Sequence, residues 1–319
     1  MKNTFSILSS LTLMALLLSC QPKSKDVKET ATSTGTMTSG SQPNEIKPNF
    51  TEGEIQVSIT TPGSKLGEMF QKIDPSKGKI QEQIRKITAT LSPADQAKLE
   101  SENQKNGMMN LAIVMLPLRS VIYVKDDQAT AKFDALTYHG ENYINDKKKE
   151  GLMYLKSQNS AKEATLSYTG ENLKKMASTD VTSDAYNITT TKDTELIDGY
   201  LCTKSIYTLK NDSKPAAQST GMPGATGKIY RLEVWASKQM PMAVNFVHPL
   251  YVAENSGIMK ILIQYEKESK LRVLYQFTKV NARPVTAAEL SIHKTAKIID
   301  FGKSELAASM ELFGIVLGM

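Results

Sequence analysis

Cysteine, histidine and tryptophan are scarce in this chain, whose 319 residues include two Cys, three His and one Trp. A small scaffold held together by several disulfides is therefore excluded. The histidines at positions 139, 248 and 293 are isolated in the sequence, and no C-x-x-C, H-E-x-x-H or paired-histidine spacing occurs. We therefore expect no zinc or iron site. The G-x-S-x-G pattern of an exposed serine nucleophile is also missing, so we expect neither enzymatic activity nor a cofactor.

Long runs of apolar or like-charged residues are also missing. After residue 20 no segment reaches the ~18 consecutive apolar residues typical of a spanning helix. The net charge is +6 and the sequence pI is about 9.0, which is a mild excess for a chain of this length. The densest basic run, Lys147-Lys148-Lys149, is closed by Glu150, as is typical of a solvated turn. We expect no nucleic-acid partner.

The first twenty residues have the form of a secretory signal. Lys2 provides a positive start, and residues 5–18 form an uncharged apolar stretch. The run Leu17-Leu18-Ser19-Cys20 that follows resembles the bacterial lipobox. The resemblance implies that residues 1–19 are a signal peptide, that the Cys20 thiol carries diacylglycerol, and that the new amino terminus carries a further acyl chain such as palmitate. The alternative is an ordinary signal peptide that contains a cysteine.

Lipid on Cys20 would make membrane attachment effectively permanent, at ~0.8 kcal/mol per buried methylene. We therefore expect a lipid-anchored protein of the cell envelope, at the outer membrane, with its periplasmic or surface orientation left open. Residues 20–50 are rich in Thr, Ser and Gly and predict a flexible linker with a root-mean-square span of about 30 Å. Residues 51–319 are expected to fold as one domain. Cys202 would have no disulfide partner and is expected to be a small buried side chain.

Helical and extended patterns alternate at the start of this domain. Residues 54–60 alternate apolar and polar side chains and predict a strand. Apolar residues recur at helical spacing over 66–73 and 80–91, and a third helix is predicted from Ser92, its amino-terminal cap, to Gln104. A last helix is predicted over 304–317, with Leu306, Met310 and Phe313 on its apolar face.

From about residue 111 onward nearly everything predicts strands. Strands are expected over 121–124, 129–136, 152–155 and 164–168, with polar turns that include 125–127 and 139–141. Three later segments each present alternating apolar residues on one face: Tyr230, Leu232, Val234 and Ala236; Met259, Ile261, Ile263 and Tyr265; Leu271, Val273, Tyr275 and Phe277. Residues 213–227 are expected to form a loop and 266–269 a hairpin link. Sequential strands on short turns predict an α+β fold with an antiparallel meander.

The sequence contains a hairpin motif and a following strand motif, which consist of Ile197, Gly199, Tyr200, Cys202, Lys204, Glu233, Trp235 and Pro241. These motifs resemble an uncharacterised Bacteroidota lipoprotein domain family, itself similar to the LolA/LolB lipoprotein-sorting fold. The resemblance implies a strongly curved antiparallel sheet, an incomplete LolA-like β-barrel, with helices packed on or over its concave face. Asp198-Gly199 suits the positive φ angles of a tight hairpin, so these residues are interpreted as keeping the fold rather than as catalytic.

Two functions remain open from the sequence. In the first, the concave side of the sheet binds a lipid, an acyl chain or another hydrophobic ligand. The candidate lining consists of Tyr230, Leu232, Val234, Met259, Ile261, Ile263, Leu271, Val273, Tyr275 and Phe277. In the second, the core is filled and the outer face docks a cell-envelope partner, whose identity the sequence does not indicate. Plain core packing is the alternative reading of every lining residue.

Overall fold

The computed structural model describes residues 46–74, 77, 79–105, 116–172, 181, 184–210, 229–247, 252–265, 267 and 271–317, all within one compact unit that begins at Ile46. Cys20, the signal peptide, the predicted loop at 213–227 and most of the predicted link at 266–269 lie outside the described residues. Residues 46–50, which precede the expected start of the domain at residue 51, also belong to the fold. Phe50 is buried, and the Lys47 N–H donates to the Gly199 carbonyl oxygen at 2.9 Å.

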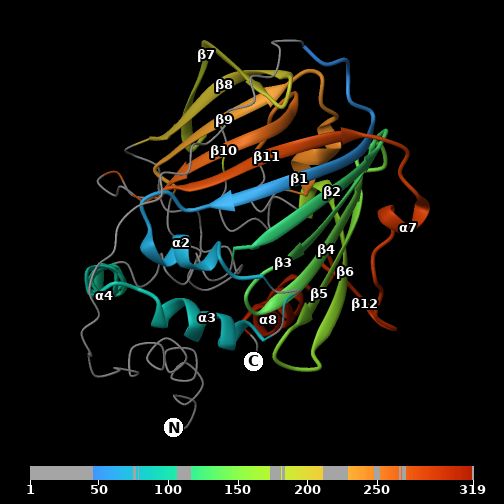
Figure 1. Ribbon diagram of the computed structural model, residues 1–319. Helices are drawn as coiled ribbons and strands as arrows, with labels where there is room; N and C mark the ends of the chain where they lie inside the picture. Colours follow the sequence, from blue (N-terminus) through green and yellow to red (C-terminus); the bar gives the residue numbers. More distant parts are fainter. Residues whose placement is uncertain are drawn as a thin grey trace. The chain divides into compact units, whose positions relative to one another are not determined.

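One large sheet dominates the structure (Figure 1). Its strands are β1 (Glu52–Thr60), β2 (Arg119–Lys125), β3 (Gln128–Asp134), β4 (Tyr138–Asn145), β5 (Glu150–Ser157), β6 (Glu163–Thr169), β7 (Tyr186–Ile197), β8 (Tyr200–Leu209), β9 (Arg231–Ser237), β10 (Gly257–Gln264), β11 (Val273–Ala282) and β12 (Ile298–Asp300). The helices are α2 (Lys65–Phe70), α3 (Ile80–Ala89), α4 (Pro93–Lys105), the 3-10 helix η2 (Met242–Phe246), α7 (Ala287–Leu290) and α8 (Glu305–Val316).

The sheet consists of two meanders joined by the first strand. Its order is β12-β6-β5-β4-β3-β2-β1-β11-β10-β9-β8-β7, so β1 pairs with β2 on one side and with β11 on the other. Because β12 and β7 stand at opposite ends of this order, the sheet is an unclosed barrel, and the predicted α+β class with a curved sheet is confirmed. The expected antiparallel pairing needs one correction, since the short edge strand β12 runs parallel to β6.

Irregular pairing helps to bend the sheet. The register shifts at Gln56/Val57 between β1 and β11, at Ile258/Lys260 between β9 and β10, and at Thr190/Thr194 between β7 and β8. Bulges of this kind increase local twist and curvature. The apolar residues on the concave side belong to one large core cluster that spans both meanders.

The helices occupy different faces of the sheet. Helix η2 contacts β10, β2, β3 and β4, and α8 contacts β5, β6 and β12. Their buried side chains belong to the concave-side core cluster. Helix α7 covers the outer face of β2 and β3, where the Thr130 hydroxyl donates to the Leu290 carbonyl oxygen at 2.7 Å. The expected helices 66–73, 80–91, 92–104 and 304–317 correspond to α2, α3, α4 and α8.

Two sequence predictions about local structure are wrong. Residues 139–141 were expected to form a turn but lie within β4, because the polar Glu141 is buried among hydrogen-bond partners instead of facing water. The predicted apolar face of α8 is also wrong. Leu306 and Met310 are each 62% exposed, while Ala308, Ile315 and Val316 are buried. Since α8 is apolar around most of its circumference, its sequence did not indicate which face meets the core.

Candidate functional site

Two rows of apolar side chains cross the concave face. Strand register places Val234, Ile261, Tyr275 and Ile59 side by side across β9, β10, β11 and β1. The next row contains Leu232, Ile263 and Val273. Residues directly opposite one another on neighbouring strands point to the same side of a sheet. The alternation in the sequence therefore correctly identified side chains that share one continuous apolar surface.

The remaining candidate lining residues surround these rows. Phe277 pairs with Val57 farther along β1, and Met259 occupies the bulge between β9 and β10. Leu271 comes just before β11, and Tyr230 just before β9. All ten candidates are buried, at 0–8% exposure, except Tyr230, which is half-buried. Tyr230 lies at the end of the sheet where β1 leads into α2, because its N–H donates to the Gln264 carbonyl oxygen at the end of β10.

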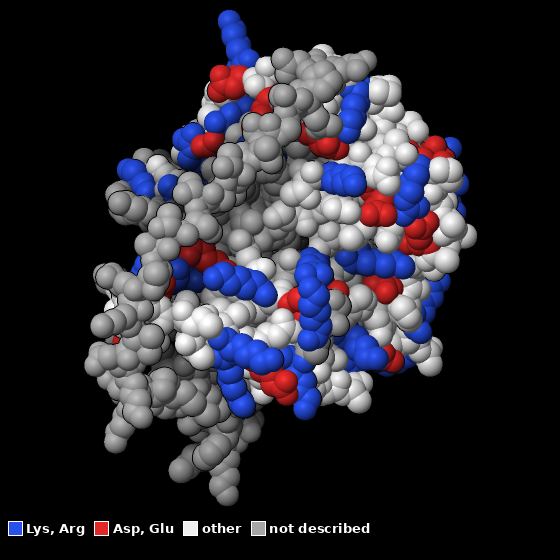
Figure 2. Space-filling view, viewed as in Figure 1, with Lys and Arg blue, Asp and Glu red and all other residues white. Residues whose placement is uncertain are grey.

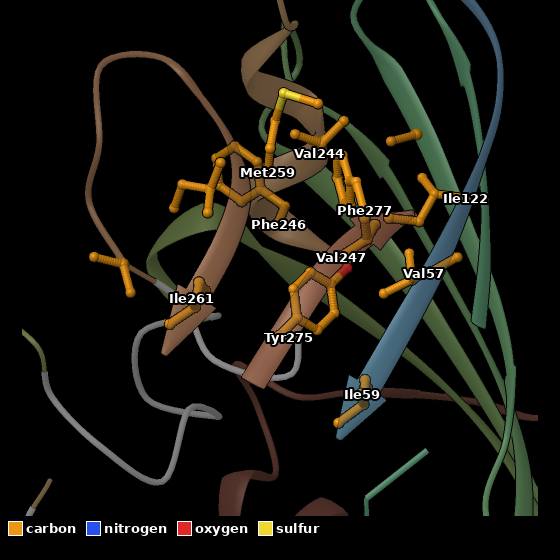
Figure 3. Close-up of a cluster of buried hydrophobic side chains, with 14 of the residues drawn as sticks. Val57, Ile59, Ile122, Val244, Phe246, Val247, Met259, Ile261, Tyr275 and Phe277 are labelled. Carbon is orange, nitrogen blue, oxygen red and sulfur yellow. The ribbon is translucent and has the colours of Figure 1, made fainter. Parts of the chain in front are cut away.

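Helix η2 plugs one end of this apolar surface. Val244, Phe246 and Val247 meet the side chains of Phe277 and Ile122 in one buried cluster (Figure 3). Two connected hydrogen bonds hold helix η2 in position. The Asn142 side chain donates to the Phe246 carbonyl oxygen at 3.1 Å and accepts from the Tyr168 hydroxyl at 2.6 Å. Burial raises the pKa of Tyr168, so this hydroxyl stays protonated as a donor.

Helices α2, α3 and α4 follow β1 in the chain, and α2 contacts both α3 and α4. Ser64 caps the amino terminus of α2, where its hydroxyl accepts from the Gly67 N–H at 3.0 Å, and α4 adds a carboxylate to the same end. The Glu102 carboxylate accepts from the Lys65 N–H at 2.9 Å and from the Ser64 hydroxyl at 3.3 Å. A carboxylate suits this position because the first N–H groups of a helix have no partners within the helix. Lys65 and Asp95 add an ion pair at 2.9 Å.

The helical layer has its own apolar side chains. Leu66, Met69, Phe70 and Ile73 are buried, yet among the described residues they are not members of the large core cluster of the sheet. An ion pair of 2.8 Å between Asp74 and Arg119 connects the segment after α2 to the start of β2. Among the described residues, the apolar side chains of the helical layer are therefore distinct from the core cluster on the concave face of the sheet.

Sequence reasoning missed a polar cluster on the outer face of the sheet. Glu141 is only 2% exposed and accepts from the His293 N–H at 2.7 Å. It also contacts His293 Nδ1 at 2.8 Å and His139 Nε2 at 3.3 Å, and the other ring nitrogen of His139 lies 2.8 Å from Asp134. The two histidines that are isolated in the sequence are therefore brought together in space. A buried acid between two basic side chains was not visible in the sequence because Glu141 and His293 are 152 positions apart.

The pKa values of this cluster shift in opposite directions. Hydrogen bonding to Asp134 and then to Glu141 raises the pKa of His139 to about 9. Burial alone would raise the pKa of Glu141, but hydrogen bonds from His139 and His293 outweigh it and lower that pKa to about 2. Both groups are therefore charged at neutral pH. Within the described part of the chain, however, no group of three or more His, Cys, Asp or Glu side chains is placed to hold a metal ion.

The motif residues of the family resemblance also converge. Lys204 pairs with Glu233 at 2.6 Å, and its ammonium lies 5.1 Å from the centre of the Trp235 ring. Lys260 approaches the same ring at 4.1 Å. The Asp198-Gly199 turn has the expected positive φ angles, 46° and 83°. Cys202 is fully buried, which confirms the prediction of a small buried side chain, and burial raises the pKa of its thiol to about 12.

Charges of both signs are interspersed on the face shown in Figure 2, many of them as ion pairs such as Arg283 with Glu54 at 2.7 Å. None of the helices in the described ranges combines the length and the apolar character needed to cross a membrane.

No model of a known protein family and no curated protein sequence matches the chain. Solved structures do match. PNGF-II is 13% identical with a TM-score of 0.39, covering 81% of this chain and 34% of that one. Lipoprotein LppX from Mycobacterium tuberculosis is 12% identical with a TM-score of 0.29, covering 74% of this chain and 89% of that one. A domain described as an outer membrane lipoprotein-sorting protein domain, from Vibrio parahaemolyticus, is 8% identical with a TM-score of 0.15, covering 54% and 83%.

The chain spans about a third of the length of the PNGF-II structure that it matches. A lipoprotein and a lipoprotein-sorting domain are among the matches. All three TM-scores lie below 0.5, so the function is argued from the residues of the chain itself.

Proposed function

We propose that this chain is a non-catalytic lipoprotein of the cell envelope, anchored at the outer membrane through Cys20, which binds a hydrophobic ligand such as an acyl chain. The ligand would lie between the concave face of the sheet and the layer of α2, α3 and α4. The protein would belong to the Bacteroidota family that the hairpin motif resembles. Neither a cofactor nor a nucleic acid takes part in this function.

The observations that support the proposal are the row of apolar side chains on the concave face and the apolar side chains of α2 that lie outside the core cluster of the sheet. The row of Val234, Ile261, Tyr275 and Ile59 reaches the end of the sheet that leads into α2. The apolar side chains of α2 are packed within a helical layer that is separate from the sheet core. The Asp74–Arg119 ion pair connects this layer to the start of β2. Each methylene of a ligand transferred into such a space gains about 0.8 kcal/mol.

The second candidate function is a structural module with a filled core. The near-complete burial of the candidate lining favours it, since nine of the ten side chains are at most 8% exposed without any ligand. In that case the outer face of the sheet would dock an envelope partner, and the concave side would contribute only stability.

Ligand binding separates the two functions. The protein made from Gln21 onward, which lacks Cys20, should be titrated with a fluorescent fatty acid. We expect saturable binding, and a Tyr230→Ala variant should bind about tenfold more weakly, because it removes a half-buried aromatic side chain at the open end of the surface. Tyr143→Ala is the matched control, since Tyr143 is also half-buried but hydrogen-bonds Gln128 on the outer face at 2.9 Å.

The absence of saturable binding by the unsubstituted protein would reject ligand binding. An equal loss of affinity in the Tyr230→Ala and Tyr143→Ala variants would reject the concave face as the binding surface. The first result, together with a protein partner captured by crosslinking in cells, would favour the structural module.

A further inference from the structure

Exposed apolar side chains gather at the tip of the β7–β8 hairpin. Leu196 and Leu201 form a cross-strand pair on either side of the Asp198-Gly199 turn, and they are 39% and 42% exposed. Ile46, the first described residue, is 56% exposed. We name Ile46, Leu196 and Leu201 the tip patch. Large side chains of this kind are costly to leave in water, and a cluster of them marks an interaction surface.

Backbone and side-chain hydrogen bonds hold the patch together. The Lys47 N–H donates to the Gly199 carbonyl oxygen at 2.9 Å, which fixes the entering chain beside the turn. The Gln239 side chain joins both segments, since it accepts from the Leu201 N–H at 2.9 Å and donates to the Lys47 carbonyl oxygen. These hydrogen bonds therefore hold the segments around the tip patch in a defined position. Lys238, the neighbour of Gln239 in the chain, is exposed and provides a cation suited to phosphate headgroups.

The position of the patch in the chain indicates its partner. The described fold begins at Ile46, so the patch lies where the chain arrives from Cys20, the expected lipid anchor. The linker expected between them has a span of about 30 Å, which keeps the arriving end close to the membrane. We propose that the tip patch inserts into the lipid bilayer that carries the anchor and thereby orients the domain on the membrane. This step rests on lipidation of Cys20 and is independent of any ligand on the concave side.

Weak insertion suffices for this role. A short tether gives the patch an effective concentration in the ~mM range at the membrane, so three apolar side chains need not bind vesicles on their own. The opposite end of the sheet offers a matched control. Leu306 on α8, which contacts the edge strand β12, is 62% exposed, and β12 lies at the opposite end of the strand order from β7 and β8.

The experiment measures lipid contact of the tethered protein. The chain beginning at Cys20, with Cys202→Ala, is coupled through the Cys20 thiol to a maleimide lipid. The vesicles contain phosphatidylcholine and phosphatidylglycerol in equal amounts, with or without brominated acyl chains, which quench nearby tryptophan. Leu201→Trp and Leu306→Trp variants are compared with the unsubstituted chain, whose single tryptophan is the buried Trp235. Circular dichroism checks that each variant folds.

We expect brominated lipid to reduce the fluorescence of the Leu201→Trp variant and to leave the Leu306→Trp variant at the level of the unsubstituted chain. Adding Ile46→Ser and Leu196→Ser to the Leu201→Trp variant should abolish the loss. The proposal is overturned if the folded Leu201→Trp variant is not quenched, if Leu306→Trp is quenched as strongly, or if the serine substitutions change nothing. Quenching of Leu306→Trp alone would assign the membrane contact to α8 instead.

Discussion

Replacing Glu141 by Gln tests the buried cluster on the outer face of the sheet. The substitution keeps the size of the side chain but removes its negative charge. Two histidine contacts and the His293 N–H then face an amide that offers only one oxygen as an acceptor. Hydrogen bonds to charged groups contribute about 1.5–3 kcal/mol each. Because the His293 side chain is 73% exposed, solvent screening reduces its share, and we expect a total loss of about 2–3 kcal/mol.

The pH dependence gives the same cluster a second signature. The folded pKa of His139 is raised from 6.5 to about 9, so its stabilising contribution is complete below pH 6.5 and is lost as the pH rises through about 9. The folded pKa of Glu141 is lowered from 4.5 to about 2, so its contribution is complete above pH 4.5 and is lost as the pH falls through about 2. The cluster therefore stabilises the fold most between pH 4.5 and 6.5.

Urea unfolding at pH values of about 5.5 and 9.5 measures both effects. The wild-type protein should be less stable at the higher pH. The Glu141→Gln variant should be less stable than wild type at pH 5.5. Its free energy of unfolding should fall less than that of wild type between pH 5.5 and 9.5, because only Asp134 then stabilises the charged form of His139. Glu150→Gln, an exposed position on β5, is the control. Equal stability of the Glu141→Gln and wild-type proteins at pH 5.5, or a wild-type stability that does not change between the two pH values, would refute the reasoning.

Three further predictions concern the helical layer, the hairpin turn and the buried thiol. Glu102→Ala removes the carboxylate that accepts from the Lys65 N–H at the start of α2, while the Ser64 cap remains, and should cost about 1 kcal/mol. We expect faster amide exchange in α2 with the sheet unchanged, whereas the exposed Glu100→Ala should leave exchange as it is. Gly199→Ala places a side chain at a φ of 83°, with its Cβ 2.9 Å from the Lys47 side chain. We expect it to lower the free energy of unfolding by at least ~1 kcal/mol, whereas Gly302→Ala should not. Equal urea midpoints for the two variants would contradict this expectation. Cys202, in protein made from Gln21 onward, should react with a thiol reagent only after unfolding, and rapid reaction of the folded protein would contradict its burial.

Local patterning was enough to predict most elements of the fold. Period-two alternation identified β1, β9, β10 and β11, and the face shared by Val234, Ile261 and Tyr275 follows from it directly. The α2–α4 helices were also visible, and Ser92 accepts from the Asp95 N–H at 3.1 Å as its expected capping role requires. These features depend on neighbours in the sequence, so the sequence contains the information needed to predict them.

Features that depend on distant contacts could not be predicted in the same way. The position of β1 between β2 and β11 joins segments more than two hundred residues apart, and no local pattern specifies that pairing. Strand β4 was missed because its buried polar residue, Glu141, has a partner 152 positions away. Alternation also predicted that Leu232, Ile263 and Val273 share one face, but the packing of the helices against that face depends on contacts that alternation does not encode.

The most direct test of the central claim is a native mass spectrum of the protein made from Gln21 onward and purified without detergent. Because this protein lacks Cys20, any lipid it carries must be held by the fold rather than by a covalent anchor. We predict a population heavier by the mass of one hydrophobic molecule, which organic extraction removes and identifies. A spectrum that contains only the mass of the bare polypeptide, from protein that is folded by circular dichroism and that leaves added fatty acid unbound, would contradict the claim.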